Sequence, residues 1–535
     1  MGDRVFNLAD VFELVADAVL DRVALVADPV VHTYAELDRR ANRFGHALHE
    51  RGVGPGAHVG ILARNRAEWV EAMVGCYKAR VVPVNLNYRY VAPELRYVVD
   101  NADLTALVYE RAFSPLVAES FTGFPAPGTL LVVEDGSDGG PEVSGAESYE
   151  DALAGASPDR GFGPRSPDDL YLLYTGGTTG MPKGVMWRQE DIFFAAMGGS
   201  GWGTGPVESP EGIVERVPTD DTGRVVMLVI GPLMHGNAQW AMWNSITVGG
   251  TTVLATDHRF EADRIWRLVE RERVVSIALV GDAMARPLAH ALSTSPPGTY
   301  DTSSVFVVAS GGAMLSKTVK QELRSQLPDA IIMDRFGSSE SGAQGAVEDG
   351  ADGPRFVMSD DTGVLDEELR PLRPGDGRMG RLARTGRIPL GYYKDEEKTA
   401  ATFPVDPDGV RWSVPGDLAT VEADGTITVH GRGSACINTG GEKVFPEEVE
   451  SALKTHPDVF DAIVVGVPDE RFGSRVAAAV LPRQGTAPGI GELQDHCRTL
   501  IAGYKVPREV VLVAELPMTA AGKPDAKAAR EFFGS

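Results

Sequence analysis

The feature that most limits the possible folds is the alternation of helical and strand patterns in the first third of the chain. Thr33 and Glu36 have the T-x-x-E spacing of a capping box, and they open a helix whose apolar residues recur every three or four positions. The runs HVGILA (58–63), VVPVNL (81–86) and LTALVY (104–109) are predicted strands, and helical patterns separate them. Repeated strand–helix–strand units imply a parallel sheet covered by helices on both faces. The predicted fold class is therefore α/β.

A second, smaller unit is predicted near the C-terminus. Pro446 followed by Glu447 and Glu448 favours a helix start, because proline fits the first turn and acidic side chains complement the helix dipole. The strand pattern DAIVVGV follows, and the remaining residues suit a small α+β domain. We therefore predict a large N-terminal domain over residues 1–432, with parallel and mixed sheets covered by helices, and a small C-terminal domain over residues 433–535.

The charge balance excludes one class of partner. Lys and Arg number 51 against 75 Asp and Glu, which gives a formal net charge of −24. Because affinity for nucleic acid comes largely from neutralising phosphates, we expect no nucleic-acid surface. Neither a signal peptide nor an apolar run long enough to span a bilayer is visible. We expect a cytoplasmic protein without integral membrane association, and peripheral contact stays open if the substrate is a lipid. Monomer and homodimer both remain open.

The stretch YTGGTTGMPKGV (174–185) is built to hold phosphate. It follows an apolar strand pattern and combines glycines, whose backbone N–H groups can approach an anion, with threonine hydroxyls and a lysine. The stretch is not a P-loop, because Lys183 follows Pro182 and precedes Gly184 rather than standing in G-K-[ST]. Gly201-Trp-Gly203 lacks the third glycine of a G-x-G-x-x-G fingerprint, and no G-x-S-x-G motif occurs in the chain.

This stretch closely resembles the signature loop of the adenylate-forming superfamily, which includes acyl- and aryl-CoA synthetases, peptide-synthetase adenylation domains and luciferases. Further signatures occur in the superfamily's order, at 310–315, 334–340, 411–419, 431–450 and 516–525. The resemblance covers nearly the whole chain, from about residue 10 to residue 530. It implies that ATP, CoA and Mg²⁺ bind to this chain.

The resemblance also assigns expected roles to individual residues. The expected phosphate-binding residues are Thr175, Gly176, Gly177, Thr178, Thr179 and Lys183. The expected contacts to the rest of ATP or AMP are Gly311, Gly312, Ala313, Asp334, Arg335, Phe336, Gly337, Ser338, Ser339, Asp417, Arg432 and Lys523, with both ribose hydroxyls on Asp417. Glu340 would help to hold Mg²⁺, and the expected catalytic residues are Lys523, Glu340, Thr175 and His235.

The implied reaction has two steps. A carboxylate attacks the α-phosphate of ATP to give an acyl-adenylate and pyrophosphate, and Lys523 would place positive charge between the two anions. The small domain, mobile in this superfamily, would then rotate about Ser434, so that Gly440, Gly441 and Lys443 line a tunnel for CoA. Ser434 departs from the usual Asp or Lys at the hinge. Pro415 departs from the usual Ser or Thr before Gly-Asp, and Phe336 replaces the more usual Tyr.

The acid and the acceptor are less constrained. Peptide-synthetase domains hold the substrate ammonium with an aspartate, and no acidic residue occurs between Gly231 and Thr256, so an amino-acid substrate is disfavoured and CoA is the expected acceptor. The segments around 184–199 and 232–243 are most similar to those of bacterial synthetases for fatty acids or steroid side chains. Those acids are the first expectation and an aryl acid is the alternative. His235, Trp240 and Met242 are candidates for the acyl pocket, although core packing would equally explain each of them. A catalytically inactive nucleotide-binding protein is the alternative from another class.

Overall fold

The computed structural model describes residues 5–140, 142–175, 181–201, 204–218, 220, 223–313, 315, 317–350, 353–357, 359–432, 437–444, 446–517 and 525–534. Of residues 282, 317, 318, 347–350, 353, 354, 430–432, 447 and 451, the backbone alone is described. Six of the predicted site residues lie outside the described residues: Gly176, Gly177, Thr178, Thr179, Ser434 and Lys523.

An eight-stranded sheet in the described part of the chain contains the strands predicted in the first third. Its order is β19 (Gly391–Tyr392), β9 (Lys183–Arg188), β8 (Leu170–Thr175), β4 (Val82–Asn85), β3 (His58–Leu62), β5 (Leu104–Glu110), β6 (Thr129–Val133) and β7 (Ala146–Ser148). The predicted strands β3, β4 and β5 are confirmed to within one residue at each end and pair in parallel, whereas β8, β9 and β19 pair antiparallel.

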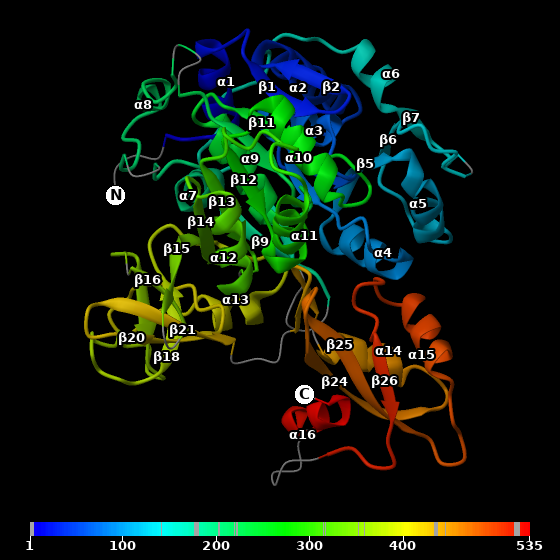
Figure 1. The fold of residues 1–535 in the computed structure, drawn as a ribbon. Coiled ribbons are helices and arrows are strands. Elements are labelled where there is room, and N and C mark those ends of the chain that lie inside the picture. The colour runs from blue at the N-terminus through cyan, green and yellow to red at the C-terminus, as the bar shows by residue number, and fades with distance from the viewer. Residues whose placement is uncertain are drawn as a thin grey trace.

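A second sheet has thirteen strands among the described residues. Its parallel half consists of β1 (Val23–Ala27), β11 (Thr251–Leu254), β10 (Val226–Val229), β12 (Ser276–Leu279), β13 (Val307–Gly311) and β14 (Ile331–Ser338), with β2 (Val30–Thr33) antiparallel at the edge. The antiparallel half continues through β15 (Gly342–Gly350), β16 (Gly353–Val357), β21 (Thr426–Arg432), β20 (Asp417–Val421), β18 (Gly380–Arg384) and β17 (Thr362–Leu365). In Figure 1 this half forms the yellow-green lobe at the lower left.

Helices form three layers around the two sheets. The inner layer shares one core with the facing strands and consists of α1 (Leu8–Ala18), α2 (Tyr34–Glu50), α3 (Ala67–Lys78), α6 (Tyr149–Ala154), α7 (Gln189–Ala196), α8 (Glu211–Val214) and α9 (Gly236–Ile246). The outer face of the thirteen-stranded sheet carries α10 (Ala262–Glu272), α11 (Gly281–Thr294) and α12 (Lys317–Gln326). The outer face of the eight-stranded sheet carries α4 (Ala92–Asn101) and α5 (Ser114–Phe121), and the short α13 (Glu396–Thr402) contacts β19.

The capping box predicted before α2 is confirmed. Glu36 N donates to Thr33 Oγ1 at 3.2 Å, and Thr33 N donates to Glu36 Oε2 at 2.8 Å. These two bonds satisfy backbone donors that the first turn of a helix otherwise leaves open. The helix therefore begins where the sequence pattern places it.

The small domain lies below the large domain in Figure 1, drawn from orange to red. Its sheet contains β22 (Ile437–Thr439), β23 (Glu442–Val444), β24 (Val459–Asp469), β25 (Gly473–Pro482) and β26 (Glu509–Leu512). The helices α14 (Pro446–Lys454) and α15 (Ile490–Arg498) cover one face, and α16 (Ala526–Arg530) covers the other. The predicted fold class, an α/β domain followed by a small α+β domain, is thus confirmed. The boundary at 432/433 remains a prediction, since 433–436 lie outside the described residues.

Candidate active site

A cavity of about 240 Å³ opens where the parallel strands end and the small domain meets the large one. The large domain contributes the ends of β8, β13 and β14 and one face of α9. The small domain contributes the turn before β23 together with Tyr504 and Lys505. Open α/β sheets bind their ligands at the carboxyl ends of the strands, so this cavity is the candidate active site.

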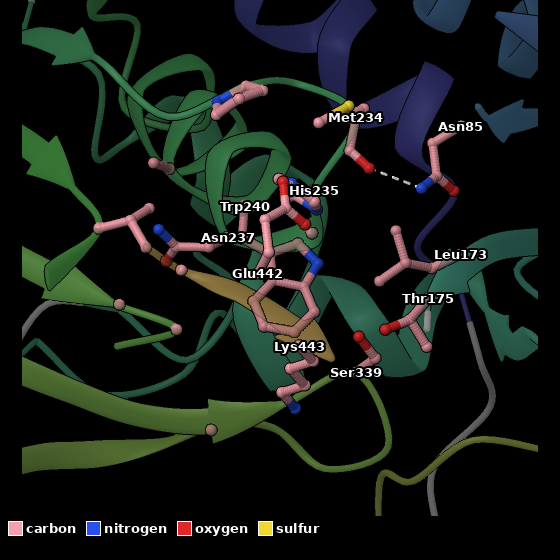
Figure 2. A pocket seen from close by; sticks show the side chains of 18 of the residues that line it. Asn85, Leu173, Thr175, Met234, His235, Asn237, Trp240, Ser339, Glu442 and Lys443 are labelled. Atoms are coloured by element: carbon pink, nitrogen blue, oxygen red, sulfur yellow. Dashed lines mark hydrogen bonds and ion pairs between the residues drawn. The ribbon is translucent and has the colours of Figure 1, made fainter. Parts of the chain in front are cut away.

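Asn85 ties two strands and a loop together at this edge. Its Nδ2 donates to Met234 O at 2.6 Å (Figure 2) and to Tyr174 O at 2.8 Å, and Tyr174 N donates back to Asn85 Oδ1 at 2.8 Å. The amide is buried and fully used, so it fixes the end of β8 against the segment that leads into α9. Sequence reasoning missed Asn85, although a polar residue inside the apolar run VVPVNL was a usable signal.

The two described ends of the predicted phosphate loop lie on paired antiparallel strands. Thr175 ends β8, lines the cavity, and is the register partner of Lys183, which begins β9. The Lys183 Nζ lies 3.4 Å from Asp395 Oδ2 and 5.5 Å from the centre of the Tyr392 ring. Burial, together with the neighbouring Lys398, lowers the pKa of Lys183 to about 8. A bound phosphate would oppose this shift by favouring the charged form.

Glu340 is held close to the same strand pair. Its Oε1 accepts a hydrogen bond from Tyr392 Oη at 2.9 Å, and its backbone carbonyl accepts one from Ser413 Oγ at 2.6 Å. Tyr392 therefore contacts both Lys183 and Glu340. The structure thus brings the predicted phosphate lysine and the predicted Mg²⁺ carboxylate to one place.

Besides Thr175, seven predicted nucleotide residues line the cavity and form its nucleotide wall: Gly311, Gly312, Arg335, Phe336, Gly337, Ser338 and Ser339. A Cβ on Gly311 would lie 2.2 Å from Asn237 Oδ1, so the absence of a side chain lets β13 and α9 approach each other. The Phe336 ring stacks on Phe356 with centroids 5.4 Å apart. Burial lowers the pKa of Arg335. Asn237 is a cavity residue that sequence reasoning missed.

Two predicted nucleotide residues, Asp334 and Ala313, lie behind the nucleotide wall of the cavity and do not line it. The Asp334 carboxylate is buried, lies 2.7 Å from Lys320 Nζ, and accepts a hydrogen bond from Leu315 N at 2.9 Å. Ala313 offers its carbonyl to Ser310 Oγ at 2.6 Å. Neither residue is among those that line the cavity. Their polar groups are already used in holding the segment after β13, which explains why they support the wall.

The predicted ribose pair also lies outside the cavity lining. Asp417 begins β20 and is the Cα partner of Arg432, the last residue of β21. The Asp417 side chain is mostly buried. The antiparallel pairing thus brings together two residues that are well separated in the sequence.

The small domain presents the predicted CoA-tunnel residues Gly440, Gly441 and Lys443 to the cavity. Gly441 has a φ of +85°, and a Cβ there would lie 2.4 Å from Val280 Cγ1 of the large domain. Only a glycine can bring the backbone this close at such a dihedral angle.

Glu442 connects the two domains and was missed by the sequence interpretation. Its carboxylate pairs with Arg89, and its Oε1 lies 3.1 Å from His235 Nε2 (Figure 2). Burial opposes ionisation, but His235 and Arg89 outweigh it and lower the pKa of Glu442 to about 2. Glu442 therefore stays ionised and joins the start of α9 to the turn that carries Gly440 and Gly441.

Of the three predicted acyl-pocket residues at α9, two line the cavity and one does not. His235 precedes the helix, and Asn237, Trp240 and Asn244 lie along the face that lines the cavity. Met242 is two positions from Trp240, so it points away from the cavity and is fully buried in the inner core. Met242 is therefore not brought to the cavity, whereas His235 and Trp240 are.

Comparison with known proteins shows which family this chain belongs to. The family model described as AMP-binding enzyme matches residues 12–393, and the model of its C-terminal domain matches residues 448–523. The chain belongs to the AMP-binding enzyme family. A 3-oxocholest-4-en-26-oate–CoA ligase of Rhodococcus rhodochrous is 48% identical over 99% of this chain and 96% of its own length. A medium-chain acyl-CoA ligase, Mig, of Mycobacterium avium is 44% identical over 98% of both chains.

A solved structure extends the likeness to the whole fold of this AMP-binding enzyme. The amide bond synthetase McbA from Marinactinospora thermotolerans has a TM-score of 0.79 and 25% identity, over 99% of this chain and 100% of that one. Among the described residues, no helix is long and apolar enough to cross a membrane.

A magnesium site in this AMP-binding enzyme would depend on the nucleotide. No cluster of three His, Cys, Asp or Glu side chains suited to a metal ion occurs in the described part of the chain. Mg²⁺ is usually held by one or two carboxylates and by substrate phosphates, so a single carboxylate suffices. Glu340, beside Lys183 and Tyr392, provides an oxygen ligand of the right kind.

Proposed function

We propose that this AMP-binding enzyme is an AMP-forming acyl-CoA synthetase. It would activate a carboxylic acid with ATP and transfer the acyl group to CoA. The observation that carries the proposal is the meeting of three walls in one cavity. A nucleotide wall from β13 and β14, an acyl wall from α9 and β12, and the glycine turn of the small domain all border the same space. The relatives named as CoA ligases support it.

In the first step the chain must bring two anions together. Lys183 and the backbone around Thr175 would hold the phosphates, and Glu340 would hold the Mg²⁺ that accompanies ATP and screens their charge. Asp417 and Arg432 would hold the ribose, and Phe336 would stack on adenine. Lys523 would neutralise charge between carboxylate and α-phosphate, a contribution expected of placed cations.

In the second step the chain must admit a thiol to the adenylate. Gly440 and Gly441 border the cavity beside Val280, so the small domain is oriented with this turn toward the acyl wall. The contacts of Glu442 with Arg89 and with His235 favour this orientation. A narrow pantetheine arm would pass along the glycines, and Lys443 at the cavity supplies a cation for an anionic cofactor.

The acid is proposed to be a medium- or long-chain fatty acid or a steroid-derived side-chain acid. Next to the acyl wall residues Ala241 and Ala278, the cavity is lined by the small side chain of Ala309 and by the adaptable Met227 and Met284, which leave room for an apolar substrate. The names of the relatives include both kinds of acid.

The test is a measurement of pyrophosphate and AMP over a panel of acids, with and without CoA. Fatty or steroid acids should give sustained AMP formation only when CoA is present. Benzoate derivatives as the best substrates would move the assignment to an aryl-CoA ligase. If no acid gives pyrophosphate release, the chain is not a synthetase, and nucleotide binding measured by calorimetry would then support the inactive alternative.

A further inference from the structure

The cavity has a deep end that no proposed contact to nucleotide or CoA occupies. Strand β12 runs toward the nucleotide wall, and Ser276 and Ala278 lie on its cavity face, while Ile277 and Leu279 pack into the core behind it. Val280, at the mouth, lies beside Gly441. Because Ser276 begins β12, it lies about 13 Å further down the strand than Val280, at roughly 3.3 Å per residue.

Helix α9, on the opposite wall, extends to a similar depth in the cavity. Asn237 lies at the mouth, beside Gly311, and Asn244 lies roughly 10 Å deeper at 1.5 Å per residue. The Asn244 side-chain amide donates to the backbone carbonyls of Ala196 at 2.8 Å and of Trp240 at 2.7 Å, so its N–H groups are already hydrogen-bonded within the protein. The walls around the deep end are otherwise mainly apolar: Ala241, Ala278, Ala309 and Met227.

The hydroxyl of Ser276 stands out against these walls. The residue is 5% exposed and lines the cavity, and its register partners Met227 and Val307 are apolar. Within the residues that the structure describes, its side chain has no hydrogen-bond partner. Buried hydroxyl groups in folded proteins nearly always have a partner. The missing partner is therefore expected from whatever fills the deep end.

We propose that Ser276 is a specificity-determining residue that selects acids carrying a second oxygen, as a hydroxyl or a carbonyl group. This oxygen would lie about 13 Å from the cavity mouth at Val280, the end that receives the carboxyl group of the acid. A serine hydroxyl can donate to a carbonyl and accept from a hydroxyl, so both kinds of oxygen suit it. A plain alkyl chain of the same length would leave the Ser276 hydroxyl unpaired. This inference rests on the proposed acyl-CoA synthetase function, because it names the acid for the same site.

Matched pairs of acids test the proposal. Each pair has one chain length, and one member ends in a methyl group while the other carries an ω-hydroxyl or a keto group near that end. The kcat/KM for AMP formation with CoA should favour the oxygen-bearing acid at one chain length. In Ser276→Ala that preference should fall by roughly three- to tenfold, the factor of one neutral hydrogen bond.

Ser245→Ala is the matched control. Ser245 is fully buried and its hydroxyl lacks a partner among the described residues, but it lies outside the cavity lining. This variant loses the same atom and should keep the parent's preference. An equal loss in both variants would overturn the proposal, since the effect would then not come from the cavity.

Two further outcomes would overturn the role of Ser276. One is a parent enzyme that shows no preference at any chain length, and the other is a preference that Ser276→Ala leaves unchanged. Calorimetric binding of each acid pair in the presence of a non-hydrolysable ATP analogue is measured alongside. If no acid is activated, the proposed function fails, while the binding preference still decides the inference about Ser276.

Discussion

At the scale of single residues, Gly441 is the position where an added side chain should affect one half-reaction alone. Its φ of +85°, and the 2.4 Å that would separate a Cβ at this position from Val280 Cγ1, leave no room for a side chain. In Gly441→Leu we expect thioester formation from preformed acyl-adenylate and CoA to fall at least tenfold, because leucine would fill the pantetheine path. Pyrophosphate release without CoA should change little. Rapid-quench assays of each half-reaction give the two rates.

Gly485→Leu is the control for backbone strain. Gly485 also has a φ of +85°, but nothing lies within 4 Å of the position of its Cβ. A leucine there carries the same conformational cost without blocking the cavity. If both variants lose thioester formation equally, strain in the small domain is the cause and the tunnel assignment is wrong.

At the scale of elements, one buried lysine joins the two domains. Lys505 Nζ donates to Glu94 Oε1 of α4 and to Glu448 Oε1 of α14, each at 2.7 Å, and all three side chains are almost inaccessible. One cation between two carboxylates leaves an excess negative charge. Burial and the neighbouring Glu94 raise the pKa of Glu448 to about 7, although Lys505 opposes this. This contact should therefore depend on pH.

The sign of that dependence follows from the raised pKa. Between the ordinary value of 4.5 and about 7, the folded protein binds more protons at Glu448 than the unfolded chain does. The stability contributed by this carboxyl is thus greatest at low pH and is lost as the pH rises toward 7. Glu448→Gln mimics the protonated form, so its stability relative to the parent should increase by roughly 1–3 kcal/mol between pH 5 and pH 8. Hydrogen exchange of the β24 and β25 amides measures it.

Asp495→Asn provides the comparison for this pH experiment. Asp495 belongs to α15 of the same domain, and its side chain is 77% exposed, so the substitution removes an equal charge from solvent. Its exchange profile should run parallel to that of the parent from pH 5 to pH 8. A parallel profile for Glu448→Gln as well would contradict the assigned pKa shift.

Local sequence patterns predicted the elements better than the contacts between them. The strands β3, β4 and β5 follow apolar runs, and the Thr33–Glu36 box fixed the start of α2. Helical spacing would also have separated Met242 from Trp240, but only once the cavity face of α9 was known. The contacts of Glu442 and Lys505 depend on how two domains meet, and no local pattern encodes that.

At the scale of the whole molecule, the proposed function requires the orientation of the small domain to set which half-reaction the cavity can perform. The turn with Gly440 and Gly441 borders the cavity, and contacts of Glu442 and Lys505 hold it there. The family resemblance assigns Lys523 to the other half-reaction. Two sets of residues on one small domain can serve one cavity in turn only if the domain reorients between steps.

Substitution of Lys523 tests that alternation. In adenylate formation its ammonium would offset the charge on two anions, and loss of such a donor typically costs about a hundred- to a thousandfold in rate. Lys523→Ala should therefore release pyrophosphate from ATP and acid at a strongly reduced rate. Supplied with preformed acyl-adenylate and CoA, the same variant should form thioester at nearly the parent rate, because that step uses the orientation in which Gly441 borders the cavity.

Lys527→Ala is the control for loss of a cation from this end of the chain. Lys527 lies in α16, only four residues further along, and the family resemblance gives it no role. Both half-reactions should proceed at parent rates in this variant, with unfolding midpoints unchanged in each protein. Lys523→Ala and Gly441→Leu should show opposite losses, the first in adenylate formation and the second in thioester formation. If Lys523→Ala loses both half-reactions equally while its fold is intact, a single orientation must perform both steps, and the two-orientation mechanism fails for this enzyme.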